Sequence, residues 1–184
     1  MDRRRSLGFL GTILTTLALP SVSFGTTARA VSLRDLVARS TRVVFGVPLE
    51  GTPRYEQIGE TRHIVTYTRF RVDELLQGGP QEPEILVRTL GGRLGELGEI
   101  VHGEAELALN ERCVMFVQAH PEGFEQVTAM AQGHYPMLPD ESGALRLHAS
   151  HNMAHLIGAP DSAAARLSGT KLADARSLII GARR

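Results

Sequence analysis

Three histidines lie close together near the C-terminal end of the sequence, in the stretch HASHNMAH. If Ser150 begins a short helix there, His151 and His155 lie one turn apart, which is the spacing of the H-E-x-x-H zinc peptidases. Asn152 stands where those enzymes carry a glutamate, and an amide cannot act as their general base. Zinc or copper binding by His148, His151 and His155 remains a hypothesis, because imidazoles alone coordinate these metals. The alternative is a set of exposed histidines beside a packed turn, with no cofactor.

Five glycines occur within the 19 residues from Thr89 to Leu107. A phosphate-binding loop needs a lysine after its glycines, and a dinucleotide site needs G-x-G-x-x-G; this stretch has neither, and its four glutamates would repel phosphate. We therefore predict turns between strands, where glycine permits a positive φ. A flexible flap that contacts a ligand is one alternative. A calcium site on the glutamates is another, although the D-x-D-x-D-G spacing of calcium loops is missing.

Motifs for nucleophilic catalysis are weak in this chain. Cys113 lies in the apolar run RCVMFV, where burial would make its thiol inert. The tetrapeptide SGTK, residues 168–171, has the S-x-x-K spacing of penicillin-binding enzymes but lacks their companion motifs, and G-x-S-x-G is missing. We therefore predict no catalytic residue and favour a protein that is not an enzyme. An enzyme that uses dispersed residues is left open.

The N-terminal segment has the parts of an export signal. Three arginines, residues 3–5, precede an apolar run of 13 residues from Leu7 to Leu19, which is shorter than the roughly 20 residues of a membrane span. Ala28-Arg29-Ala30 then matches the A-x-A cleavage pattern. We predict that residues 1–30 are a cleaved signal peptide and that the protein is exported to the bacterial periplasm or the extracellular space. An uncleaved anchor helix is the alternative, and the choice between Sec and twin-arginine export stays open.

Cleavage after residue 30 would leave 154 residues, a length that suits one domain. It would also remove four arginines and one aspartate, leaving 16 basic against 19 acidic residues and a net charge of −3. A mildly acidic domain argues against nucleic acid and against anionic lipid as partners. We also expect no stable insertion into a membrane after cleavage. A single cysteine predicts a fold without disulfides, which a buried core must stabilise.

Alternating apolar and polar residues predict several short strands in the mature chain. The strongest is residues 62–76, where Ile64, Phe70 and Val72 share a face; nearly continuous apolar residues place 111–119 in the middle of a sheet. Further strands are expected in residues 42–50, 84–90, 123–138 and 143–149, with bends at Gly46 and Gly133 and a turn-rich connection at 50–60.

Helices are expected only near the ends of the mature chain. Ser32 can cap a helix in residues 32–40, because its hydroxyl can accept from the first free backbone N–H groups. In residues 169–184, Thr170 is a candidate cap, Ala175 and Ile179 lie on the apolar stripe, and Gly181 is expected to end the helix.

These elements predict a mainly β fold, a small antiparallel OB-like barrel of five to six strands with short N- and C-terminal helices. A β-sandwich is the alternative. Residues 31–160 would form the barrel domain, and residues 161–184 a C-terminal helix that packs on the barrel.

The order of RVVFGVPLE, IVTYTRFRVDELLQG, the glycine-rich middle, NERCVMFVQ and AMAQGHYPM resembles exported bacterial proteins of uncharacterised function. It is more distantly similar to the OB-like barrel of netrin and metalloproteinase-inhibitor modules. The likeness covers roughly Ser32 to Leu138 and lies in the rhythm of the strands. Those inhibitors begin with a cysteine that reaches a metal, whereas this mature chain would begin with Val31, so their inhibitory activity is not implied.

Together these features predict an exported, non-catalytic binding module with a protein or a cell-envelope component as its partner. The ligand-binding candidates are the corner residues Gln132, His134 and Tyr135, together with Arg88 on a strand. The competing hypothesis is a metal-binding protein or metalloenzyme built on the three clustered histidines.

Overall fold

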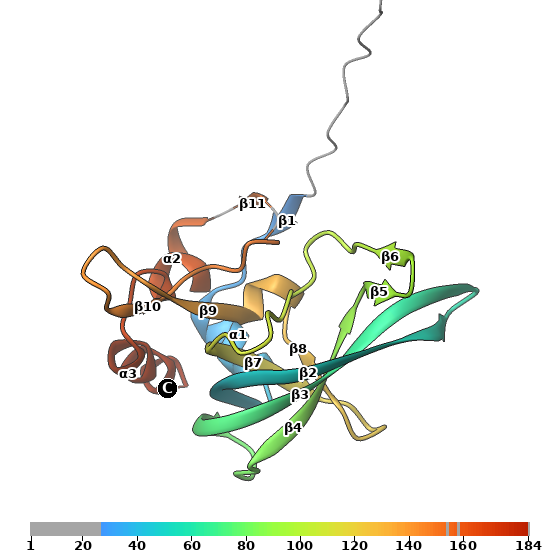
Figure 1. The fold of residues 1–184 in the computed structure, drawn as a ribbon. Coiled ribbons are helices and arrows are strands. Elements are labelled where there is room, and N and C mark those ends of the chain that lie inside the picture. Colours follow the sequence, from blue (N-terminus) through green and yellow to red (C-terminus); the bar gives the residue numbers. More distant parts are fainter. Residues whose placement is uncertain (1–26, 154, 158, 184) are drawn as a thin grey trace, which may run out of the picture.

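The computed structural model describes residues 27–153, 155–157 and 159–183, with residues 27, 155–157 and 159 described by backbone alone (Figure 1). The strands are β1 Thr27–Arg29, β2 Arg42–Ile58, β3 Thr61–Gly78, β4 Glu84–Leu90, β5 Gly92–Leu94, β6 Leu97–Glu99, β7 Cys113–Ala119, β8 Glu125–Val127, β9 His134–Pro139, β10 Leu145–Leu147 and β11 His155–Ile157. The α-helices are α1 Leu33–Arg39, α2 Ala163–Leu167 and α3 Leu172–Ala182, with 3₁₀ turns η1 Met130–Gly133 and η2 Ala159–Asp161.

The main sheet has seven strands in the order β10-β9-β7-β2-β3-β4-β8. All neighbours in it are antiparallel except β4 and β8, which are parallel, and β8 also pairs antiparallel with β7. Strands β5 and β6 form a hairpin of their own, and β1 pairs in parallel with β11. The predicted mainly β class is therefore confirmed. The expected five to six purely antiparallel strands are not: the sheet has seven strands and is mixed.

The β2–β3 hairpin is longer than the sequence suggested, because residues 50–60 do not form a turn-rich connection. Strand β2 continues to Ile58 and stays paired with β3 up to Thr61, with Gly59 in the turn at φ +61°. Three register shifts bend the pair. At Gly46 the backbone comes so close to β3 that a Cβ would lie 1.9 Å from the Arg71 carbonyl oxygen, which explains the glycine.

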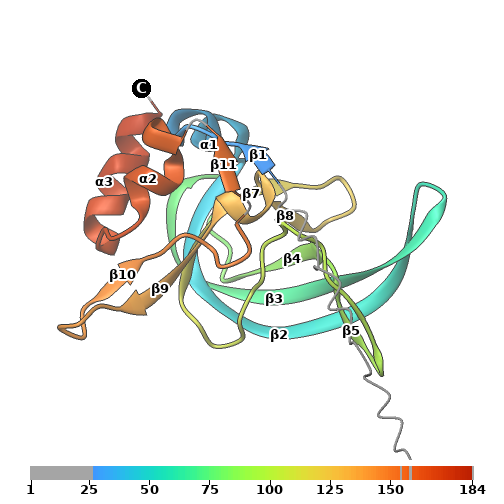
Figure 2. The same cartoon turned by 90° about the horizontal axis from the view of Figure 1, so that it is seen from above.

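Strand β7 lies between β9 and β2 and is buried on both faces, as its apolar run predicted. On one face Val114 and Phe116 pack with side chains of the three helices. On the other face Cys113, Met115 and Val117 pack with residues of β2, β3 and β4. Figure 2 shows the helices together at one end of the molecule and the β2–β3 hairpin extending past the other.

The buried faces of the helices are those that the sequence predicted, but some of the helix ends differ from the prediction. The Ser32 hydroxyl accepts from the Asp35 N–H, so the predicted cap of α1 is confirmed. The C-terminal segment holds two helices, α2 and α3, instead of one. Helix α3 has Lys171 at its N-cap and continues through Gly181, while the Thr170 hydroxyl donates to the Leu167 carbonyl.

The predicted signal peptide lies outside the described residues except for its last four positions. Of these, residues 27–29 form β1, which pairs with β11; Ala28 is half-buried and Arg29 is exposed. Among the described residues, none of the helices combines the length and the apolar character that crossing a membrane requires.

Candidate functional site

One face of the β3–β4 ladder changes from apolar to hydroxyl-bearing along its length. At one end Phe70 on β3 and Val87 on β4 belong to the core. Continuing along the same face, β3 presents Thr68 and Thr66, and β4 presents Thr89 directly opposite Thr66. Side chains two residues apart on a strand share a face, so these threonines extend the core surface with polar groups.

The glycine-rich segment, which follows Thr89 and extends to Leu107, folds over these threonines. The Thr66 hydroxyl donates to the Gly91 carbonyl at 2.8 Å. A Cβ at Gly92 would lie only 2.2 Å from the Thr66 Oγ1, and both glycines have positive φ, +87° and +134°. The expected positive φ is therefore confirmed at both positions, although Gly92 lies in β5 and not in a turn, and the backbone's close approach to β3 explains why side chains are missing there.

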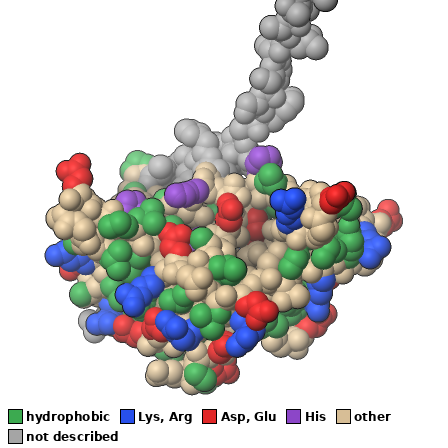
Figure 3. Space-filling model, in the orientation of Figure 1, with side chains coloured by type: hydrophobic (Ala, Val, Ile, Leu, Met, Phe, Trp, Pro, Cys, Tyr) green, Lys and Arg blue, Asp and Glu red, His purple; other side chains and the backbone are tan. Residues whose placement is uncertain are grey.

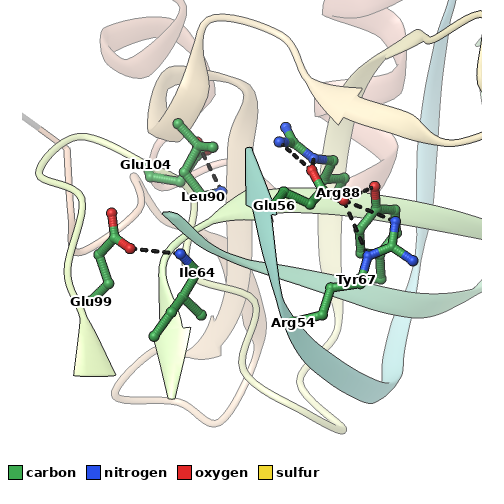
Figure 4. A network of polar contacts seen from close by, with 8 residues as sticks. All are labelled: Arg54, Glu56, Ile64, Tyr67, Arg88, Leu90, Glu99 and Glu104. Atoms are coloured by element: carbon green, nitrogen blue, oxygen red, sulfur yellow. Dashed lines mark hydrogen bonds and ion pairs between the residues drawn. The ribbon is translucent and has the colours of Figure 1, made fainter. Parts of the chain in front are cut away.

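Glu99, at the end of β6, connects the β5–β6 hairpin to the first part of β3 through hydrogen bonds (Figure 4). Its carboxylate accepts from the Ile64 N–H at 2.6 Å and lies 2.6 Å from His63 Nδ1. The hydrogen bond with His63, followed by that from the Ile64 backbone, lowers the pKa of Glu99. The carboxylate is thus occupied by β3 at two points.

Between the β3–β4 ladder and the glycine-rich segment lies a pocket of about 560 Å³. Its polar lining includes Thr66, Thr68, Thr89 and Asn152, and its apolar lining includes Ile100, Val101, Ala105 and Leu107. Three glutamates, at positions 99, 104 and 106, line it together with one arginine, Arg93. Figure 3 shows this face of the molecule hollowed near its centre, with acidic side chains beside the hollow.

Glu104 is the buried carboxyl group of this pocket, with 8% of the residue exposed. One oxygen accepts from the Ala105 N–H at 2.9 Å, and the other accepts from the Leu90 N–H at 3.3 Å (Figure 4). Loss of solvent on burial raises the pKa of Glu104, and the two backbone hydrogen bonds only partly oppose this. Perturbed carboxyl groups in clefts are typical of functional sites.

Two threonines that line the same pocket as Glu104 are also buried: Thr68 is 2% exposed and Thr89 is 7% exposed. Within the described part of the chain, neither hydroxyl takes part in a hydrogen bond, and both residues line the pocket. Buried polar groups are usually satisfied, so hydroxyls that face an open pocket are available to a ligand or to water.

The opposite face of β3 and β4 carries a polar network around Glu56 (Figure 4). Its carboxylate accepts from the Tyr67 hydroxyl at 2.6 Å, from Arg54 at 2.8 Å and from Arg88 at 2.7 Å. Burial alone would raise the pKa of Glu56, but these hydrogen bonds outweigh it and lower the pKa to about 2. Arg88, a predicted ligand-binding residue, therefore lies outside the pocket with its charge neutralised, 5.6 Å above the Phe124 ring.

The other predicted ligand-binding residues lie together on η1 and β9, away from Arg88. The Gln132 side chain accepts from the Val31 N–H and donates to the Arg29 carbonyl, so it holds the N-terminal segment. Tyr135 is fully buried and packs edge-to-face on Phe116.

His134, between Gln132 and Tyr135, is buried with its Nδ1 3.3 Å from the Ser150 hydroxyl. Burial, together with the charge of nearby His151, lowers the pKa of His134 to about 4. At neutral pH this imidazole is therefore uncharged.

The predicted helix of the histidine cluster does not form. His151 and Asn152 lie in a turn, and a strand begins at His155, so the one-turn spacing argument is wrong. The side chain of His155 lies outside the described residues. Among those that are described, no three His, Cys, Asp or Glu side chains are grouped as for a metal ion. A metal site at His148, His151 and His155 stays a prediction.

Sequence reasoning missed Thr66, Thr68, Thr89 and Glu104 as site residues. The threonines were assigned to strands, where they are common, and Glu104 was one of four glutamates in a segment predicted to be turns. The one available signal was the replacement of apolar by hydroxyl residues along a core-facing strand side. Cys113 is buried as predicted, and burial raises the pKa of its thiol.

Comparisons with known proteins add no relative to this description: no family model matches the chain, and neither a curated protein nor a solved structure is significantly similar to it. The likeness to netrin and metalloproteinase-inhibitor modules therefore stays a prediction from the rhythm of the strands.

Proposed function

We propose that this chain is an exported binding module that holds a small ligand in the pocket between the β3–β4 ladder and the glycine-rich segment. One observation carries the proposal: Thr68, Thr89 and Glu104, all buried, line the same pocket beside apolar side chains. Ligand sites commonly combine an apolar lining with a few convergent polar groups.

The fold supports a rigid site of this kind. Strand β8 pairs with both β4 and β7, so the pairings run from β7 through β2, β3, β4 and β8 back to β7. We infer from this ring that the five strands close into a small barrel, with the pocket at the end that the glycine-rich segment covers. Small barrels often bind ligands at their mouths.

Export is part of the proposal and rests on the three N-terminal arginines, the 13-residue apolar run and the Ala28-Arg29-Ala30 pattern. Mass spectrometry of the protein recovered from the periplasm or medium of the expressing bacterium should give a chain that begins at Val31. A full-length chain that stays in the cytoplasm would contradict export.

The binding proposal can be tested by NMR with a panel of small neutral, cationic and anionic fragments. At least one class should shift the backbone amides of Leu90, Gly91 and Ala105, which border the pocket, and its effect should weaken in Thr68→Val, which keeps the shape of the side chain and removes its hydroxyl. If no fragment moves these amides at millimolar concentration, the binding module proposal fails.

The metal-binding alternative keeps one supporting observation. His148 Nε2 is buried and has no hydrogen-bond partner within the described residues, as a metal-binding nitrogen would in the absence of its ion. Elemental analysis of protein purified without a histidine tag tests it. Stoichiometric zinc or copper that disappears in His148→Ala would support this alternative, and a metal content unchanged by that substitution would contradict it.

A further inference from the structure

The charges that line the pocket are unbalanced. Glu99, Glu104 and Glu106 stand against Arg93, and Arg93 is exposed and donates from Nε to the Gly95 carbonyl. A cleft lined mainly by one sign of charge attracts ligands of the opposite sign and repels those of the same sign. A carboxylate or phosphate ligand is therefore disfavoured, and a cation is favoured.

The three carboxylates are not equivalent. Glu99 is held by His63 and the Ile64 N–H, and Glu106 is exposed to solvent, where water screens its charge. Glu104 is buried, and each of its oxygens receives only one backbone N–H, which leaves acceptor positions on both. Glu104 is therefore the carboxylate with which a ligand cation can form its strongest ion pair.

The groups around Glu104 suit an ammonium ion. An ammonium has three N–H donors and needs three acceptors when it leaves water. Thr68 and Thr89 supply hydroxyl oxygens on the same strand face, and Glu104 accepts from the N–H of Leu90, the residue that follows Thr89. Val101 and Leu107 line the same pocket and offer apolar contact to the rest of a ligand.

We propose that the pocket binds a primary aliphatic amine, whose ammonium group pairs with the Glu104 carboxylate and donates to the hydroxyls of Thr68 and Thr89. This inference rests on the proposed binding function and specifies its ligand class. An inorganic cation such as calcium fits less well, because calcium takes six to eight oxygen ligands and Glu99 is already engaged by β3.

Isothermal titration with four probes tests the proposal at pH 7: n-hexylamine, n-hexanol, hexanoate and calcium chloride. Hexylamine and hexanol share an apolar chain and differ in charge, so their ratio of affinities isolates the ion pair. We expect hexylamine to bind at one site about tenfold or more tightly than hexanol, and hexanoate and calcium to bind more weakly still.

Substitutions test which residues bind the amine. Glu104→Gln should reduce hexylamine affinity about tenfold or more and bring it close to that of hexanol, while Thr68→Val should reduce it several-fold. Glu96→Gln is the matched control, because it removes an exposed charge of the same segment outside the pocket lining, and it should change affinity by less than about threefold. Circular dichroism establishes that each variant is folded, and Thr68→Val keeps the proposal falsifiable if Glu104→Gln does not fold.

Equal affinity for hexylamine and hexanol, tighter binding of calcium or hexanoate, or a folded Glu104→Gln that retains full amine affinity would each overturn the amine inference. If hexanol or hexanoate shifts the amides of Leu90 and Ala105 and binds at least as tightly as hexylamine, the binding module survives while the amine inference fails. If none of the probes moves these amides, both proposals fail.

Discussion

The hydroxyl of Thr66 donates a hydrogen bond to the carbonyl of Gly91 at 2.8 Å, and this contact seats the glycine-rich segment on β3. The neighbouring Gly92 leaves no room for a Cβ beside the same hydroxyl. On this side, the wall of the pocket is therefore formed by the backbone of the glycine-rich segment, which contacts β3 without an intervening side chain. The glycines are needed for close approach as well as for turning.

Substitution of Gly92 tests this contact. Gly92→Ala places a Cβ 2.2 Å from the Thr66 Oγ1 at a φ of +134°, so we expect a loss of about 2 kcal/mol or more in the free energy of unfolding. Gly98→Ala is the control, since the nearest atom to its Cβ would be the Gly92 carbonyl oxygen at 3.9 Å; its effect should stay within about 0.5 kcal/mol. Urea denaturation measures both. Equal effects would show that close packing at Gly92 is unimportant.

The Glu56 network predicts a loss of stability in acid. Its folded pKa of about 2 lies below the ordinary value of 4.5, so the folded state favours the carboxylate and gains stability above pH 4.5. That gain should disappear as the pH falls from about 4.5 to about 2. We expect Glu56→Gln to flatten this part of the curve of unfolding free energy against pH, and the exposed Glu60→Gln to leave it unchanged. A wild-type curve parallel to that of Glu56→Gln would contradict the network.

Glu104 should give the opposite pH dependence. Burial raises its pKa in the folded state, so its contribution to stability is complete below the unfolded pKa and is lost as the pH rises through the folded pKa. Relative to Glu104→Gln, the wild-type protein should therefore lose stability as the pH rises above about 4.5. Unfolding curves of both proteins across this range measure the difference, with Glu106→Gln as the control. A difference that is independent of pH would show that Glu104 is not buried as described.

Removal of residues 1–30 should leave the fold intact. Strand β1 contributes pairing with β11 and the Arg29 carbonyl that Gln132 reaches, whereas Val31 keeps its own N–H bond to Gln132. A chain that begins at Val31 should lose less than about 1 kcal/mol in the free energy of unfolding, because the described side chains of β1 are the half-buried Ala28 and the exposed Arg29. Leu36→Ala in the same chain, which removes a fully buried side chain, should cost about 2–5 kcal/mol. A larger loss on truncation than in Leu36→Ala would place β1 within the folded domain and argue for cleavage elsewhere.

Local patterns in the sequence predicted correctly those elements that depend on the residues of a single strand or helix. Alternation predicted β4 at residues 84–90 as observed, and Ser32 predicted the start of α1, because each depends on neighbouring residues alone. They failed at residues 50–60, where glycine and proline suggested a turn. There the pairing with β3 keeps the chain extended, and Pro48 and Pro53 are accommodated within β2.

The pocket could not be predicted from such patterns, because it depends on contacts between distant residues. Thr68 and Glu104 are 36 positions apart, and nothing local distinguishes Glu104 from the exposed Glu96 or Glu106. The parallel pairing of β4 with β8, which changes the predicted antiparallel sheet to a mixed one, also joins distant segments. In the histidine cluster, residue spacing suggested a helix, but the chain forms a turn and a strand.

The most direct test of the account is a crystal structure of the protein with n-hexylamine at saturating concentration. We expect the amine nitrogen within about 2.7–3.2 Å of a Glu104 carboxylate oxygen, with the alkyl chain against Val101 and Leu107. An amine bound elsewhere, or a pocket that stays without it at saturation, would contradict the assignment of Glu104 as the group that holds the ligand.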